Sequence, residues 1–197
     1  PELVQKILAE TQIPWIRLLY LYPDKITDEL VAVIRDNDRV CKYVDLPIQH
    51  VNDTVLARMN RHGDGAVVRA AVEKIRREIP GVTLRTTAIV GFPGETEAQF
   101  AELCEFVKET GFDRFGAFTY SPEEGTPAAE FPDQIDEQVK QDRYDTLMAV
   151  QLEVSEKKMQ EKIGDVIEVL CEGYDPDEDS YYGRTYADSP DIDGKIW

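Results

Sequence analysis

Along the first 130 residues, short apolar runs alternate with segments in which apolar residues recur every three or four positions. The apolar runs are rich in β-branched and aromatic residues and predict buried strands at residues 15–21, 40–46, 82–91 and 114–120. The intervening segments, for example the one with Phe100, Leu103 and Val107 on one face, predict amphipathic helices. Because parallel neighbouring strands need a long return path, this alternation predicts an α/β fold with a parallel sheet, either open or closed.

The pattern changes after residue 135. A long polar-rich helix is predicted at residues 136–163, with a few apolar residues on one side. Beyond it, strands are predicted at residues 166–171 and 181–186, separated by an acidic turn at residues 175–179. This change in the residue pattern indicates a small β module after the α/β part.

The two residue patterns predict two structural units. We expect the first to comprise residues 1–159 and the second, an unfinished β module, to comprise residues 160–197. The chain begins at Pro1 rather than Met, and its last residues resemble the start of a strand. We therefore expect it to be part of a longer protein.

The chain is strongly acidic. Its 39 acidic and 22 basic residues give a net charge of -17, which repels phosphate backbones and disfavours direct nucleic-acid binding. A basic protein partner or a small ligand fits this charge better. No apolar run approaches the roughly 18 residues of a membrane span, and the first residues carry no signal-peptide pattern. We expect a cytoplasmic protein without a membrane partner.

The three cysteines give no local metal site. Cys41, Cys104 and Cys171 lie far apart along the chain and form no C-x-x-C pair. We expect three buried, reduced thiols and no metal bound by this chain.

The most informative string is Ile89-Val90-Gly91-Phe92-Pro93-Gly94-Glu95-Thr96. A predicted strand runs here into two glycines and a proline, and Thr96 and Gln99 then form a T-x-x-Q capping box that begins a helix. Such a strand end exposes backbone groups that a flat ring can approach closely. The string lacks the glycine spacing of dinucleotide folds and the lysine of a P-loop, so a phosphate is not the expected ligand.

Polar residues also gather after the second predicted strand and inside the third. His50 either has a structural role or contacts a ligand, and both alternatives remain open. Arg85 lies in an apolar strand and needs an anionic partner, either the internal acid Asp45 or a ligand carboxylate. Glu123 and Glu124 follow the last strand as an acid-base pair or, alternatively, as solvated loop residues.

These strings together resemble the radical S-adenosylmethionine (SAM) methylthiotransferases. The resemblance rests on residues 46–50, 59–61, 85–96 and 120–128, which follow the family's order, and on the string at residues 183–194. It implies a partial TIM-like barrel of six strands, of which the chain would supply the last four βα units. It also implies that the β module is the start of a TRAM domain, an incomplete small β-barrel.

The resemblance also implies a SAM site. Gln49 and Asp53 correspond to contacts with the ribose or the amino-acid part of SAM, and Arg85 corresponds to a contact with its carboxylate or with a neighbouring acid. The adenine would rest on a backbone shelf and beside an aromatic ring, at Gly91, Phe92, Pro93 and Tyr120. We therefore expect Gln49, Gly91 and Tyr120 to converge on one pocket. No catalytic residue is assigned.

The family's iron-sulfur ligands are not in this sequence. The resemblance implies two 4Fe-4S clusters in the full-length protein, one held by a C-x-x-x-C-x-x-C motif that we expect about 70 to 80 residues before Trp15. We expect the chain itself to bind no cluster and to be inactive alone.

Several functions remain open. The resemblance is to the branch that methylthiolates an aspartate of a basic small-subunit ribosomal protein, with the tRNA-modifying branch of MiaB type as the alternative. A second class of function is a non-catalytic platform that binds a protein partner. A third is a cluster-free barrel enzyme that uses Arg85, Glu123 and His50.

Overall fold

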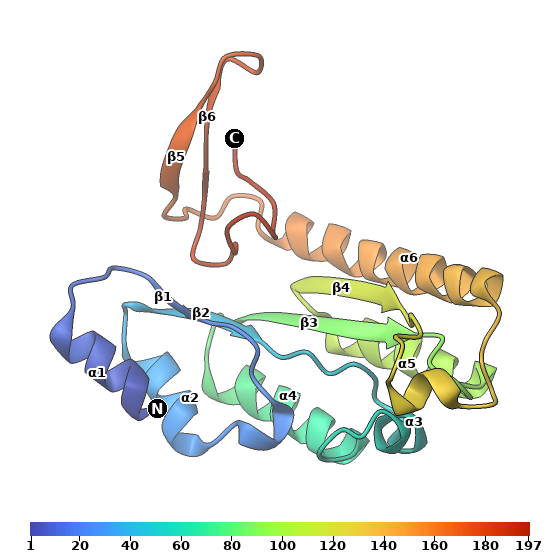
Figure 1. Ribbon diagram of the computed structural model, residues 1–197. Coiled ribbons are helices and arrows are strands. Elements are labelled where there is room, and N and C mark those ends of the chain that lie inside the picture. The colour runs from blue at the N-terminus through green and yellow to red at the C-terminus, as the bar shows by residue number, and fades with distance from the viewer.

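The computed structural model describes residues 1–197. Four strands and five helices alternate before a long sixth helix and a hairpin (Figure 1). In chain order the elements are α1 (Glu2–Glu10), β1 (Ile16–Leu18), η1 (Pro23–Lys25), α2 (Asp28–Asp36), β2 (Val40–Asp45), α3 (Asp53–Arg58), α4 (Gly65–Glu78), β3 (Thr83–Val90), α5 (Glu97–Thr110), β4 (Arg114–Thr119), η2 (Pro127–Glu130), α6 (Glu137–Glu161), β5 (Leu170–Asp175) and β6 (Ser180–Arg184).

The first four strands form one parallel sheet in the order β1-β2-β3-β4. The predicted α/β class with a parallel sheet is thereby confirmed. The first strand is shorter than predicted: it ends at Leu18, and Tyr20 adopts a left-handed conformation with φ 59°. A strand cannot continue through that conformation, so the chain leaves the sheet early.

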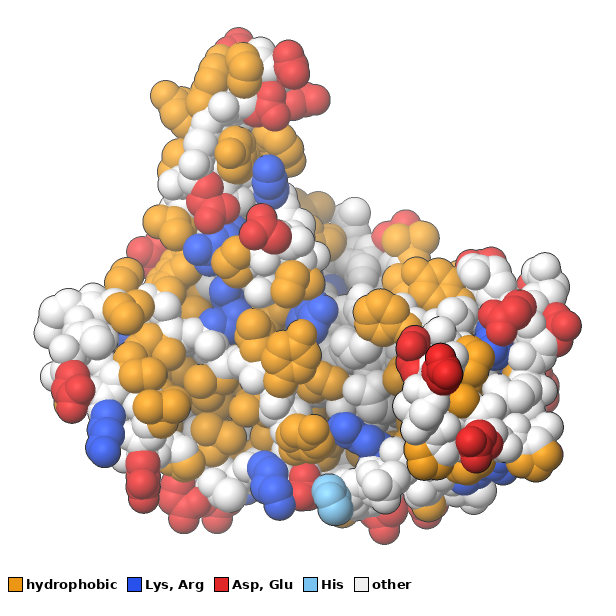
Figure 2. Space-filling model, in the orientation of Figure 1, with side chains coloured by type: hydrophobic (Ala, Val, Ile, Leu, Met, Phe, Trp, Pro, Cys, Tyr) orange, Lys and Arg blue, Asp and Glu red, His pale blue; other side chains and the backbone are white.

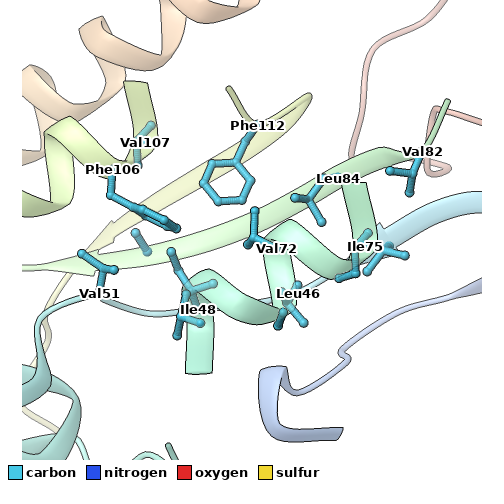
Figure 3. Packing of buried hydrophobic residues seen from close by; sticks show 14 of the residues in the cluster. Leu46, Ile48, Val51, Val72, Ile75, Val82, Leu84, Phe106, Val107 and Phe112 are labelled. Atoms are coloured by element: carbon cyan, nitrogen blue, oxygen red, sulfur yellow. The ribbon is translucent and has the colours of Figure 1, made fainter. Parts of the chain in front are cut away.

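The core lies between the sheet and the helices α2, α4 and α5. Side chains of β3 alternate: Leu84, Ala88 and Val90 are buried against the helices, while Arg85 and Thr87 face the other side and stay partly exposed. Figure 3 shows strand residues such as Leu84 packed against Val72 and Ile75 of α4. Burying each such side chain stabilises the fold by about 1.5–3 kcal/mol, so this packing determines which face of the sheet remains open.

The helix starts are set by local side chains. The predicted capping box is confirmed: Thr96 Oγ1 accepts from the Gln99 backbone N–H, and Gln99 Oε1 accepts from the Thr96 N–H. The long helix α6 begins after Asp136 and runs along β4, burying Leu147 in the core. None of the helices combines the length and the apolar character that a membrane span requires.

The β module is a hairpin that projects away from the sheet (Figure 1). Its first strand starts at Leu170, four residues later than predicted, because residues 166–169 make no strand pairing and are exposed. The register pairs Asp175 with Ser180 and places the predicted acidic turn at residues 176–179. A bridge between Gly183 and Ile196 brings the end of the chain against the hairpin.

The cysteine prediction holds only in part. Cys41 is buried, but Cys104 is half-buried and Cys171 is exposed on β5. Cys171 differs from the prediction because the hairpin has no second layer packed on it, so its side chains stay open to solvent. All three thiols are free, as predicted.

Candidate functional site

A cavity of about 340 Å³ opens toward the carboxyl ends of the strands. In parallel α/β sheets, ligand sites gather at this end. Its lining combines aromatic rings, two arginines and two polar side chains. The lining residues are Tyr20, Leu21, Tyr22, Pro47, Gln49, Arg61, Arg85, Thr87 and Phe118. Two of the seven predicted SAM contacts, Gln49 and Arg85, therefore lie in one pocket.

Gln49 is held in a strained backbone conformation. Its φ of 67° lies in the left-handed region, which costs a non-glycine residue about 1 kcal/mol or more. Two hydrogen bonds to the neighbouring strand hold it there: its N–H donates to Thr87 O at 2.9 Å, and its carbonyl accepts from Ile89 N at 2.8 Å. Such strain is typical of residues that a fold positions for a ligand.

Arg85 has an internal partner. Its Nη1 donates to Asp45 Oδ1 at 3.0 Å, and Asp45 is 1% exposed. The other carboxylate oxygen of Asp45 accepts from the Tyr20 N–H at 3.1 Å. Of the two predicted partners, the structure shows the internal acid Asp45, while Arg85 still lines the pocket.

His50 lies outside the pocket, fully buried in an ionic network. Its Nε2 lies 3.1 Å from Glu95 Oε1, and its Nδ1 accepts from the Asn52 N–H at 3.0 Å. Because Nδ1 accepts, the proton is on Nε2, which donates to Glu95. The other oxygen of Glu95 accepts from Gly91 N at 2.8 Å and from Arg143 Nη1 at 2.7 Å. His50 is therefore structural, and the hypothesis of a cluster-free enzyme that uses it is not supported by this geometry.

The sequence pattern predicted no role for Glu95, which the structure places at the centre of this network. It follows Gly94 in the most informative string, one position before the helix cap, where an acid is easily taken for a solvated N-terminal residue. Two features of the sequence could have indicated its role: Glu95 follows the end of one buried strand, and His50 follows the end of the strand before it. Its side chain is 0% exposed, so it needs partners.

The predicted adenine shelf is packed rather than open. Gly91, Phe92 and Pro93 are buried, and a Cβ at Gly91 would lie 2.4 Å from Lys140 Cγ on α6. The Phe92 ring packs edge-on against Tyr120, with 5.0 Å between ring centroids. These four predicted residues do not line the cavity with Gln49. The reason is that α6 lies over this strand end, which a sequence pattern does not reveal.

Asp53 also lies outside the cavity. Its Oδ1 accepts from the Gly65 N–H at 2.8 Å and so ties the start of α3 to the start of α4.

Glu123 and Glu124 are both exposed on the loop after β4. Neither lines the cavity, which agrees with the alternative of solvated loop residues.

The candidate metal-ligating side chains of this chain lie apart from one another. No three His, Cys, Asp or Glu side chains come together as metal ligands. The three cysteines lie on β2, α5 and β5, which are separate parts of the fold. A cluster needs several thiolates at one place.

Comparison with known proteins agrees with this fold. The model of the radical SAM superfamily matches residues 1–107, and that of the TRAM domain matches residues 163–197. Two relatives named ribosomal protein uS12 methylthiotransferase RimO, from Alkaliphilus oremlandii and Geotalea uraniireducens, are 51% and 50% identical over 100% and 99% of this chain. The chain spans 45% and 44% of their respective lengths.

A solved structure supports the fold. Coproporphyrinogen III oxidase (HemN) from Escherichia coli, described as a radical SAM enzyme, superposes with a TM-score of 0.63 at 22% sequence identity. The match covers 78% of this chain and 36% of that chain. Since the superfamily model covers more than half of the sequence, the chain belongs to the radical SAM superfamily.

Proposed function

We propose that the protein containing this chain is a methylthiotransferase that modifies ribosomal protein uS12, and that the chain supplies part of its SAM site. The observation that carries the proposal is the identity of about 50% to RimO proteins across essentially the whole chain. The target is an aspartate of uS12, and the reaction takes place in the cytoplasm.

The cavity suits the SAM molecule chemically. Its volume of about 340 Å³ lies within the range of small-molecule sites. The Tyr20, Tyr22 and Phe118 rings supply apolar surfaces for the adenosyl group, Gln49 supplies hydrogen bonds to polar groups, and Arg85 supplies a positive charge near a carboxylate. When bound, SAM supplies the radical-forming and methyl-donating chemistry; the chain's residues bind and orient it and exclude water.

The other predicted SAM residues act behind the pocket. Gly91, Phe92, Pro93 and Tyr120 form the packed layer next to the end of β3, and we propose that this layer fixes the level at which the adenosyl group rests. Asp53 is proposed to contribute by holding α3 in place through Gly65.

The charge favours a protein substrate over tRNA. A net charge of -17 opposes an RNA backbone and attracts a basic ribosomal protein. The tRNA-modifying alternative has neither this charge nor the named relatives in its favour. A chain that acts as a binding platform alone would not need the strained Gln49 in a ligand-sized cavity.

Shortening Gln49 tests the SAM site. Gln49→Asn keeps a residue that tolerates the left-handed conformation but withdraws the amide by one methylene. We expect the dissociation constant for SAM, measured by isothermal titration calorimetry, to rise about tenfold, as expected when a good hydrogen bond to a charged or polar group is lost. Glu123→Gln, at an exposed position outside the cavity, is the matched control. Equal SAM affinity in Gln49→Asn and the unaltered chain would contradict the assignment.

Reconstitution with iron and sulfide tests the cluster prediction. We expect the 197-residue chain to take up no stoichiometric 4Fe-4S cluster and to show no methylthiotransferase activity, because no set of ligands gathers in it. The measurement is the visible absorption spectrum together with iron and sulfide content. A stoichiometric cluster would contradict the prediction.

A further inference from the structure

A loop of the β module lies across the open face of the sheet. Residues 185–193, which we call the strap, follow β6 and contact a side chain from each of the four strands. These side chains are Arg17 of β1, Tyr43 of β2, Arg85 of β3 and Arg114 of β4. Figure 2 shows basic side chains gathered at the base of the projecting hairpin, and acidic ones both beside them and at the tip. The strap is therefore the contact through which the module docks on the α/β part.

The first acidic contact of the strap is Asp188. Its Oδ1 accepts from Arg114 Nη2 at 2.5 Å, and its Oδ2 accepts from the Thr185 N–H at 2.9 Å and the Thr185 hydroxyl at 2.7 Å. Burial alone would raise the pKa of Asp188, but these hydrogen bonds outweigh burial and hold it below its usual value. Asp188 thus stays ionised and anchors the strap to β4.

The second contact, Asp193, lies between two arginines. Its Oδ2 accepts from the Tyr43 hydroxyl at 2.8 Å and from the Ser189 N–H at 2.7 Å, and its side chain is 5% exposed. Its Oδ1 lies 4.0 Å from Arg85 Nε and 3.9 Å from Arg114 Nε. Arg85 and Arg114 are register partners on β3 and β4, where like charges repel each other. The Asp193 carboxylate offsets that repulsion.

A short path of contacts leads from Asp193 to the cavity. Arg85 Nε lies 4.0 Å from Asp193, Arg85 Nη1 donates to Asp45, and Asp45 accepts from the backbone N–H of Tyr20. Arg85 and Tyr20 both line the cavity. The position of these two lining residues is therefore tied to a carboxylate of the β module.

We propose that Asp193 is a positioning residue: by docking the strap it orients Arg85, and through Asp45 it holds the Tyr20 side of the cavity. The β module thereby sets the shape of the ligand pocket. By linkage, a ligand that favours this pocket shape also favours the docked strap. The ligand part of this inference rests on the proposed function; the contact part does not.

The test compares Asp193→Asn with Asp177→Asn, which removes the same charge from the exposed hairpin turn. Hydrogen exchange of the unliganded chain is followed by mass spectrometry. We expect peptides covering the Tyr20 amide to exchange about tenfold faster in Asp193→Asn and unchanged in Asp177→Asn, with α4 unchanged in both. SAM titration should show about a tenfold weaker affinity in Asp193→Asn alone.

The outcomes separate the two proposals. Faster exchange at Tyr20 with no SAM binding by the unaltered chain would support the positioning role and contradict the proposed assignment of the cavity to SAM. Unchanged exchange at Tyr20 in Asp193→Asn would overturn the positioning role. If Asp193→Asn does not fold, Tyr43→Phe replaces it, because this change removes only the hydroxyl that donates to Asp193. It should give a smaller change in the same direction, and no change would overturn the proposal.

Discussion

Replacing Glu95 with glutamine is expected to destabilise the chain by about 3 kcal/mol, the cost of breaking a buried ion pair. The Glu95 carboxylate accepts from three donors: His50 Nε2, the Gly91 N–H and Arg143 Nη1. An amide of the same size has one acceptor oxygen, so its NH2 group would face at least one of these donors. Arg143, whose side chain is 9% exposed, would also lose its buried counter-charge.

Glu97→Gln is the matched control for this change. Glu97 contacts the same Arg143 at 3.3 Å, but its side chain is 82% exposed. Exposed ion pairs contribute little, so we expect a change within about 0.5 kcal/mol. The measurement is urea-induced unfolding at neutral pH, with the two variants and the unaltered chain compared. Similar losses in the two glutamine variants would show that the buried network does not stabilise this strand end.

Replacing Gly91 with alanine is expected to cost about 3 kcal/mol or more. Two physical terms add: the left-handed conformation, with φ 72°, costs an alanine about 1–2 kcal/mol, and overpacking costs about 1–3 kcal/mol. The overpacking is specific, because the new Cβ would lie 2.4 Å from Lys140 Cγ and 3.1 Å from Lys140 Cβ. These atoms are close to the α6 backbone and cannot swing aside as a side-chain tip can.

Gly81→Ala separates the two terms. Gly81 has nearly the same conformation, with φ 71°, but no atom lies within 4 Å of the position of a new Cβ. We expect it to cost about 1 kcal/mol, the conformational term alone. Thermal and urea unfolding of both variants would give the difference that belongs to the contact with α6. A Gly91→Ala variant no less stable than Gly81→Ala would refute the packed arrangement of this turn.

Many features of this fold follow from spacing along the chain. The 3.6-residue period predicted the helices, the buried β-branched runs predicted the four strands, and Thr96 with Gln99 marked the start of α5. These signals act between residues a few positions apart, so one sequence is enough to see them. The parallel direction of the strands followed from the length of the connections.

The composition of the site depends instead on contacts between distant segments. The pairing of His50 with Glu95 joins two strand ends 45 residues apart, and the contact of Tyr43 with Asp193 joins residues 150 apart. No local pattern encodes such separations, because the interacting groups meet only when the sheet, α6 and the strap assemble. For the same reason the predicted set of SAM contacts divided into Gln49 and Arg85 in the cavity and the remaining residues outside it.

The sequence by itself therefore determined the class of the fold, the parallel direction of its strands, the capping box of Thr96 and Gln99 and the family, since each depends on short-range spacing or on a run of characteristic residues. Tertiary structure alone decided that Asp45 neutralises Arg85, that α6 covers Gly91 and that Asp193 lies between two arginines. The physical reason is that a buried charge takes whichever counter-charge the packed chain brings within reach, and that partner is set by three-dimensional proximity.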